Sequence, residues 1–182
     1  MTQAPAEPGG LVLRRAGVSD AGALALAGAA TFLETFAGVL DGPDIVAHCE
    51  REHAPARYLH WLQNEDAAAW VAQVRATAST VGYMVCARAA LPIADPDPND
   101  YEIKRIYLLS GFHGAGVGRS LVELAIADAR ARGAQRMLLG VYAGNERAIG
   151  FYRRLGFVVC GARKFLVGTR ECDDHIMSLG LG

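Results

Sequence analysis

The chain has 182 residues, of which 52% are hydrophobic and 20% charged, so its composition predicts one folded domain with a sizeable core and excludes a disordered chain. Its 18 lysines and arginines against 19 aspartates and glutamates leave a net charge of -1, which argues against nucleic-acid binding through general neutralisation of phosphates. No apolar run reaches the roughly 18 residues of a membrane span. The four cysteines contain no CxxC pair that would suggest a metal site or a disulfide framework. We therefore expect a cytoplasmic α/β (α+β) protein without a metal, a membrane partner or a nucleic-acid partner.

The first half of the chain is expected to mix helices with a strand pair. Met1–Gly10 holds two prolines and two glycines without hydrophobic periodicity, so we expect a disordered N-terminus there, followed by a single domain over residues 11–182. Ser19 or Asp20 carries a side-chain oxygen that suits the first turn of a helix. The expected elements are a strand at Leu11–Arg15, a helix ending near Ala37, a helical stretch over Asp44–Gln63 that Pro55 interrupts, a hairpin of Ala68–Arg75 and Thr80–Arg88, and an irregular exposed loop at Leu91–Asp100.

The second half alternates strands and helices. A helix over Val117–Arg132 is expected to end at Gly133, because glycine readily adopts the left-handed conformation of a helix C-terminus. The other expected elements are strands at Tyr101–Leu109 and Gln135–Val141, a helix at Asn145–Leu155, and a final strand pair, Phe157–Val167 and Cys172–Leu179, that turns at Gly168–Thr169.

The most informative segment is the glycine-rich turn Phe112–Ser120, which joins a predicted strand to a predicted amphipathic helix. The unpaired N–H groups and the positive dipole end of a helix N-terminus attract phosphate, and the glycines at 114, 116 and 118 let an anion approach the backbone. The spacing G-x-G-x-G is neither the G-x-G-x-x-G of dinucleotide-binding folds nor a P-loop. A nucleotide- or phosphosugar-binding protein fits this turn, and so does a strand–helix corner that serves packing alone.

Three sequence blocks in the second half resemble the GCN5-related N-acetyltransferase superfamily. His113–Gly118 matches the superfamily's pyrophosphate loop, Gln/Arg-x-x-Gly-x-Gly/Ala, with a histidine in the first position. Glu102–Leu108 has the register of the strand that precedes this loop, and Asn145–Phe157 follows the run Asn-x-x-Ala-x-x-Phe-Tyr-x-x-x-Gly-Phe. Three shorter segments resemble the bacterial spermidine/spermine acetyltransferases of the same superfamily: Thr31–Phe36, Leu139–Tyr142 and Asp174–Met177.

The resemblance implies a fold, a reaction and a cosubstrate. The fold is a mixed, mostly antiparallel sheet of about six to seven strands flanked by helices, with a V-shaped split between the strand before the glycine turn and the next strand. The reaction moves the acetyl group of acetyl-CoA to a primary amine of a small molecule by direct attack in a ternary complex, and the narrower resemblance implies a polyamine as that amine. The residues implied in acetyl-CoA binding are Ile106, Tyr107, Leu108, His113, Gly114, Ala115, Gly116, Val117, Gly118, Arg119, Ser120, Asn145, Ile149 and Tyr152.

Two residues are implied in the chemistry, which requires a deprotonated amine, a stabilised oxyanion and a proton for the departing thiolate. Tyr152 is the expected general acid, and a tyrosine packed between helix and sheet is the alternative. Glu102 is the expected general base, since it precedes Ile106 by an even number of residues and should share its side of the strand; a solvent-exposed carboxylate is the alternative. The residues expected to bind the acceptor are Phe32, Thr35, Phe36 and Tyr142.

A non-catalytic acyl-CoA-binding or regulatory module on the same fold is the alternative function, because a fold does not fix an activity. The presence of both Glu102 and Tyr152 favours the enzyme. The histidines at 48, 53 and 60 are too irregularly spaced for a metal site and are expected to be exposed or half-buried. The sequence leaves open whether the acceptor is a polyamine, an amino acid, an antibiotic or a peptide N-terminus, and whether the chain forms a homodimer.

Overall fold

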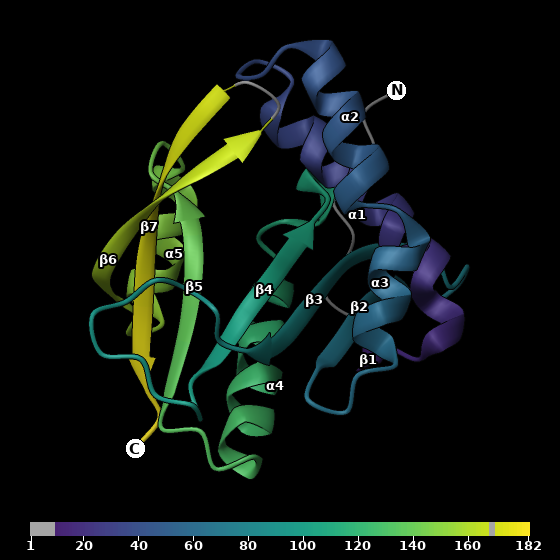
Figure 1. Cartoon of the computed structure of the whole chain (residues 1–182). Helices are drawn as coiled ribbons and strands as arrows, with labels where there is room; N and C mark the ends of the chain where they lie inside the picture. Colours follow the sequence, from purple (N-terminus) through teal and green to yellow (C-terminus); the bar gives the residue numbers. More distant parts are fainter. Residues whose placement is uncertain (1–9, 168–169) are drawn as a thin grey trace.

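The computed structural model describes residues 10–167 and 170–182, so the expected disordered N-terminus, apart from Gly10, and the turn at Gly168–Thr169 lie outside the described residues. Within the described residues the centre is a seven-stranded sheet with the order β1-β2-β3-β4-β5-β7-β6, in which only β4 and β5 are parallel neighbours (Figure 1). This mixed, mostly antiparallel sheet confirms the predicted fold class. The strands are β1 (Leu11–Arg15), β2 (Ala68–Val74), β3 (Thr80–Arg88), β4 (Tyr101–Leu108), β5 (Arg136–Tyr142), β6 (Val158–Val167) and β7 (Arg170–Gly180).

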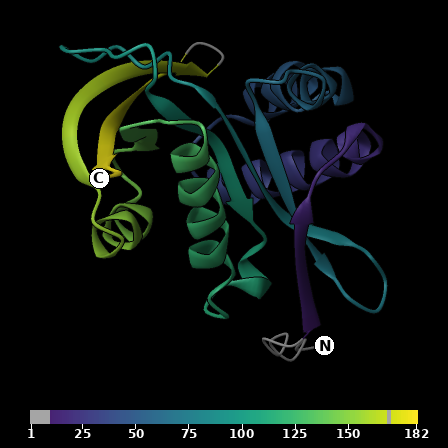
Figure 2. The same ribbon diagram turned by 90° about the horizontal axis from the view of Figure 1, so that it is seen from below.

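Five α-helices of the described chain flank the sheet. Helices α4 and α5 lie on one face of the sheet (Figure 2). On that face Leu121 packs in a core cluster with Met84. Helices α1 and α3 lie on the other face, where Leu24 packs in a second cluster with Tyr83. No helix within the described residues has the length and hydropathy to cross a bilayer. The helices are α1 (Ala21–Phe36), α2 (Gly42–Glu52), α3 (Pro55–Leu62), α4 (Val117–Ala131) and α5 (Glu146–Arg154), with short 3₁₀ turns at Val18–Asp20 and Ser110–Phe112.

In the first half of the chain the expected interruption at Pro55 is confirmed, whereas the expected side-chain cap of the first helix is not found. The helical stretch over Asp44–Gln63 is two helices, α2 and α3, because Pro55 has no N–H to continue the first helix and instead stands at the start of α3. Asp20 precedes α1 but does not cap it through its side chain. Its carboxylate accepts from Gly17 N at 2.8 Å and from both terminal nitrogens of Arg14 at 2.7 and 2.8 Å, so it fastens β1 to the turn before the helix.

The loop Leu91–Asp100 is irregular, as expected, but its ends are buried. Leu91 is 6% and Asp100 2% exposed. The Asp100 carboxylate accepts from Arg136 Nε at 2.9 Å and from Arg136 Nη2 at 2.7 Å, and these bonds hold the pKa of Asp100 below its usual value despite the opposing effect of burial. The loop therefore anchors to the start of β5 instead of standing free in solvent.

A β-bulge in β4 decides which side chains of that strand share a face. Val85 of β3 pairs with Arg105, whereas the next residue of β3, Cys86, pairs with Ile103, so Lys104 is an extra residue in β4. Ile103 and Ile106 consequently both pack in the cluster under α4, although they are an odd number of residues apart. The expectation that Glu102 and Ile106 share a face is therefore wrong, because regular alternation does not hold across the bulge.

The sheet splits between β4 and β5. These parallel strands pair only over Tyr101–Ile103 and Met137–Leu139 within the described residues, and Figure 1 shows them diverging beyond that point. On its other edge β4 stays paired with β3 up to Leu108. One edge of the second half of β4 is thus left without a strand partner, as the predicted V-shaped split requires.

Candidate active site

The glycine turn forms an open, left-handed entry into α4. Gly114 has φ +90° and Gly116, the residue before the first turn of the helix, has φ +78°, a region that other residues rarely adopt. A Cβ at either position would meet nothing within 4 Å, so the space above the turn is free for a ligand. Gly118 differs, since it already lies within α4, where a Cβ would touch the Phe151 ring at 3.5 Å. The free N–H groups of the first turn of α4 and this open space fit the pyrophosphate of coenzyme A.

The residues around the turn hold it against β4. His113 Nε2 lies 2.7 Å from the carbonyl oxygen of Leu108, so the imidazole folds back onto the strand end. Arg119 is exposed, and its Nε donates to Glu123 at 2.8 Å along the outside of α4. Val117 is buried in the core. The turn thus presents its backbone to solvent, and Arg119 is a surface cation beside it that is paired with Glu123.

Tyr152 lies on α5 with its ring inside the core. It is 7% exposed and packs edge-on between Phe151, at 5.2 Å between ring centroids, and Phe157, at 5.8 Å. Its hydroxyl makes no hydrogen bond to any residue that the structure describes. Burial raises the pKa of Tyr152, and the nearby Tyr107 raises it further, so the phenol is protonated at neutral pH.

Asn145 and Ile149 set the start of α5. The Asn145 side-chain oxygen accepts from Ala148 N at 3.1 Å, which is the hydrogen bond of a helix N-cap. Ile149 is 6% exposed and packs in the same cluster as Tyr152. Asn145 therefore fixes the helix that carries the phenol.

Glu102 lies where β4 and β5 are still paired, opposite Leu138, on the sheet face away from Ile106. It is 6% exposed, and one of its oxygens accepts from Lys104 Nζ at 2.6 Å and from Ala90 N at 2.8 Å. The structure therefore does not bring Glu102 together with Tyr152, whose ring packs on the other face. Residue alternation in the sequence did not predict this separation, because the bulge at Lys104 reverses the faces of the residues that follow it in β4.

An aromatic cluster, called here the acceptor-side cluster, closes the other face of the split. The Phe32 and Phe36 rings of α1 lie 4.5 Å apart, and Phe36 lies 6.1 Å from Tyr142 at the end of β5. Thr35 is not part of it, since it is exposed and its hydroxyl donates to the Thr31 carbonyl at 2.8 Å. Three of the four expected acceptor residues are thus brought together. The members of the cluster are Phe32, Phe36, Leu40, Ile45, Cys49, Tyr142, Phe165 and Cys172.

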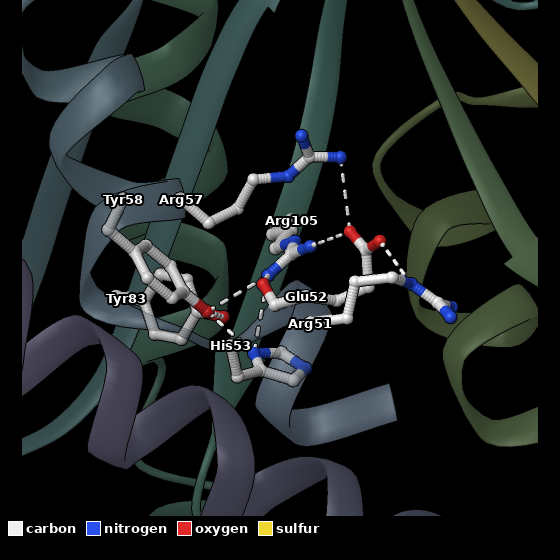
Figure 3. Close-up of polar contacts among 7 residues, drawn as sticks. All are labelled: Arg51, Glu52, His53, Arg57, Tyr58, Tyr83 and Arg105. Atoms are coloured by element: carbon white, nitrogen blue, oxygen red, sulfur yellow. Dashed lines mark hydrogen bonds and ion pairs between the residues drawn. The ribbon is translucent and has the colours of Figure 1, made fainter. Parts of the chain in front are cut away.

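A buried polar network fastens α2 and α3 to β4 beside this cluster (Figure 3). The Arg105 side chain is only 11% exposed; Nη1 donates to Tyr58 Oη at 3.1 Å and Nη2 lies 3.2 Å from the Glu52 carboxylate. Tyr58 Oη also lies 2.7 Å from His53 Nδ1 and 2.6 Å from Tyr83 Oη. The network places a desolvated guanidinium on β4, two residues before Tyr107.

The histidines of α2 and its C-terminus are buried, contrary to the expectation. His48 is 5% and His53 4% exposed, because the apolar face of α2 turns toward α1 and His48 stacks on Phe32 at 4.1 Å. Burial, together with the charge of Arg105, lowers the pKa of His48 to about 4 and that of His53 to about 3, although the charge of Glu52 opposes both shifts. Both imidazoles are therefore neutral at pH 7. His60 is exposed, as expected.

Arg163 and Asp174 form an ion pair that sequence reasoning did not single out. They face each other across β6 and β7, and both Nε and Nη2 of Arg163 lie 3.1 Å from Oδ2 of Asp174. Asp174 is 6% exposed, and burial raises its pKa although Arg163 opposes that shift. Alternation along β7 was the available signal, because it places Asp174 on the same face as Cys172 of the acceptor-side cluster.

Comparisons with known proteins identify the fold. Residues 36–157 match the model of the "Acetyltransferase (GNAT) family". An N-acetyltransferase of Mycobacterium tuberculosis is 31% identical over 160 residues, which are 88% of this chain and 97% of that protein. The streptothricin acetyltransferase of Streptomyces lavendulae is 38% identical over 80 residues, 43% of this chain and 42% of its own. The structure of a PaiA N-acetyltransferase from Thermoplasma acidophilum in complex with coenzyme A has a TM-score of 0.75 and 20% identity, and covers 93% of this chain and 98% of its own.

These comparisons agree with the split sheet and the open glycine turn. The family match spans the turn and the helix that carries Tyr152, which are the segments whose sequence resembled the superfamily. The chain therefore belongs to the GNAT family of acetyl-CoA-dependent N-acetyltransferases.

Proposed function

We propose that this protein transfers the acetyl group of acetyl-CoA to a primary amine of a small molecule by direct attack in a ternary complex. The observation that carries the proposal is the end of β4–β5 pairing at Ile103 and Leu139, between α4 on one face and the acceptor-side cluster on the other. Two substrates held from opposite faces meet at this opening in the sheet. Holding them together supplies much of the rate without a covalent enzyme intermediate.

The glycine turn and the free edge of β4 are proposed to bind acetyl-CoA, which supplies the activated acetyl group. The turn offers backbone N–H groups to the pyrophosphate, and the unpaired edge of β4 offers hydrogen-bonding groups to the amides of the pantetheine arm. Arg119, whose guanidinium is paired with Glu123 at the surface, would add a cation near the phosphates. The residues assigned to this role are Ile106, Tyr107, Leu108, His113, Gly114, Ala115, Gly116, Val117, Gly118, Arg119, Ser120, Asn145, Ile149 and Tyr152.

Tyr152 is the proposed general acid. As the amine nitrogen bonds to the carbonyl carbon, the carbon–sulfur bond breaks and the Tyr152 hydroxyl gives its proton to the departing thiolate. Two features support the role: burial keeps the phenol protonated, and its hydroxyl has no partner within the described residues that would compete for the proton.

The proton that the amine loses needs an acceptor, and Glu102 is poorly placed for that. Its carboxylate is held by Lys104 and Ala90 N at the paired end of the split. The buried carboxylate on the acceptor side is Asp174, and its raised pKa suits a group that takes up a proton.

A polyamine is the narrower form of the proposal. The Asp174 carboxylate on the acceptor side supports it, because the amines that do not react stay charged near pH 7. The guanidinium groups of Arg105 and Arg163 also lie on that side, where Arg105 is paired with Glu52 and Arg163 with Asp174, so Asp174 is not a free anion for a polycation. The names of the relatives give no common acceptor, so spermidine belongs in the first panel of amines to be tested.

Release of free thiol from acetyl-CoA in the presence of a panel of amines tests the proposal. We expect amine-dependent thiol release, and a stable N-acetyl product by mass spectrometry. Coenzyme A binding in calorimetry without turnover of any amine would instead support the non-catalytic acyl-CoA-binding module.

A further inference from the structure

The ion pair of Arg163 and Asp174 leaves one side of each partner unused. Both nitrogens of Arg163 that touch Asp174 converge on the same oxygen, Oδ2. Oδ1 of Asp174 accepts no hydrogen bond from any described residue, and it is not sealed from solvent. Arg163 Nη1 likewise makes no hydrogen bond or ion pair within the described chain, and the Arg163 side chain is 31% exposed. The pair thus presents a free carboxylate oxygen beside free guanidinium donors.

The pair stands at the opening of the sheet. A Cβ on Gly140 would lie 2.8 Å from Nη2 of Arg163, so the guanidinium rests directly on the backbone of β5. Gly140 is the first residue of β5 beyond the last pair with β4. Asp174 pairs across the strands with Tyr142, and the Arg163 guanidinium lies 5.5 Å from the Phe165 ring. The free groups of the pair therefore adjoin the aromatic rings of the acceptor-side cluster.

A purely structural role explains this pair poorly. The next pair along the same two strands, Lys164 with Asp173 at 2.7 Å, is open to solvent, with side chains 61% and 69% exposed. Asp174, in contrast, is buried, and removing its charge from water costs free energy. The two contacts from Arg163 to one oxygen of Asp174 offset only part of that cost. A ligand that satisfies the remaining oxygen and the remaining donors would offset that cost.

We propose that Arg163 and Asp174 recognise an acceptor that carries a carboxylate close to its amine, as an α-amino acid does. Oδ1 of Asp174 accepts from the ammonium group, the guanidinium of Arg163 donates to the carboxylate, and an apolar side chain packs on the rings of the acceptor-side cluster. This assignment rests on the proposed acetyl transfer and narrows its substrate class. A linear polyamine has no carboxylate to which the Arg163 guanidinium could donate.

The test compares three acceptors of similar shape: L-leucine, L-leucinamide, which lacks the negative charge, and 3-methylbutylamine, which lacks the carboxyl group. We expect wild-type kcat/KM for leucine to exceed that for the other two at least about tenfold, since a site built to pair a group discriminates against analogues without it. Arg163→Gln should bring the ratio close to one, while coenzyme A binds with unchanged affinity. Comparing ratios between enzymes cancels the different basicities of the three amines.

Two further variants separate recognition from stability. Gly140→Ala places a methyl group against the guanidinium and should lower the same ratio with Arg163 still present. Lys164→Gln removes a cation from the neighbouring, solvent-exposed pair and should leave the ratio as in wild type. Since the wild-type comparison needs no variant, a variant that fails to fold does not remove the test.

The outcomes distinguish this inference from the proposed function. If the wild-type enzyme acetylates 3-methylbutylamine or spermidine as well as leucine, the assignment of Arg163 and Asp174 is overturned and the acetyl transfer stands. An unchanged ratio in a folded Arg163→Gln enzyme overturns the assignment as well. If coenzyme A binds but no amine is acetylated, both proposals fail.

Discussion

The glycine turn makes a quantitative prediction about acetyl-CoA binding. Gly116→Glu puts a side chain into a left-handed position with open space above it, so the free protein pays backbone strain of about 1–2 kcal/mol and no steric clash. The added carboxylate then faces the pyrophosphate. At about 5 Å, one pair of unit charges repels by about 0.8 kcal/mol in water and about 3 kcal/mol at an effective dielectric constant near 20. Two phosphate charges therefore weaken binding by at least about 1.6 kcal/mol, or roughly 15-fold in Kd.

The chain provides a matched control at the other end of the same helix. Gly133 has the same φ of +78° and the same open space as Gly116, so Gly133→Glu adds equal strain and equal charge. Gly133 lies beyond the C-terminal end of α4, about 25 Å along the helix axis from Gly116 and beyond the screening length of physiological salt. Calorimetry with coenzyme A should show a large rise in Kd for Gly116→Glu and none for Gly133→Glu. Unchanged affinity in a folded Gly116→Glu protein, or an equal loss in both variants, would refute the reasoning.

Three other predictions concern catalysis and stability. Tyr152→Phe should lower kcat by about 10²-fold, which is the range typical of a positioned general acid, and should leave the Kd for coenzyme A unchanged. Full activity of the variant in a steady-state assay would mean that Tyr152 is a packing residue. Glu102→Gln should lower the melting temperature, because Lys104 loses its partner, yet leave the acidic limb of the kcat/KM profile in place; loss of that limb would restore Glu102 as the base. The lowered pKa values of His48 and His53 mean that unfolding takes up protons below about pH 6.5, so the free energy of unfolding should fall from there toward pH 4, by at most about 1.4 kcal/mol per pH unit for each histidine. Urea titrations at several pH values measure this slope, and His53→Gln should reduce it by about half. If the imidazoles titrated normally in the folded protein, they would contribute no slope, and His53→Gln would leave the pH dependence as in wild type.

Local sequence signals predicted the elements around the cosubstrate site well. The amphipathic pattern of Val117–Arg132 and the glycine after it gave a helix whose C-terminal residue, Gly133, has the left-handed φ that was expected. Asn145 caps the next helix through its side chain. These features depend on residues only a few positions apart, so they can be predicted from the local sequence without knowledge of the rest of the fold.

The acceptor side was predicted less well, because its geometry depends on how distant segments pair. Nothing in the order of residues marks Lys104 as an extra residue; only the register of β4 against β3 does. The contact between Arg163 and Asp174 likewise depends on the pairing of β6 with β7. The burial of His53 depends on Arg105 and Tyr58, which approach it from other elements. Such contacts are tertiary, and hydrophobic periodicity does not encode them.

The extra residue in β4 also explains why the sheet opens where it does. A bulge increases the local right-handed twist of its strand, and Lys104 directly follows the last residue of β4 that pairs with β5. The first part of β4 therefore holds the sheet together, and the part after the bulge is turned away from β5. Deleting Lys104 would make Ile106 and Tyr107 exchange faces and would remove the cause of the divergence at the same time. The opening between β4 and β5 therefore depends on one extra residue in the backbone of β4, and the side chain of that residue need not touch either substrate.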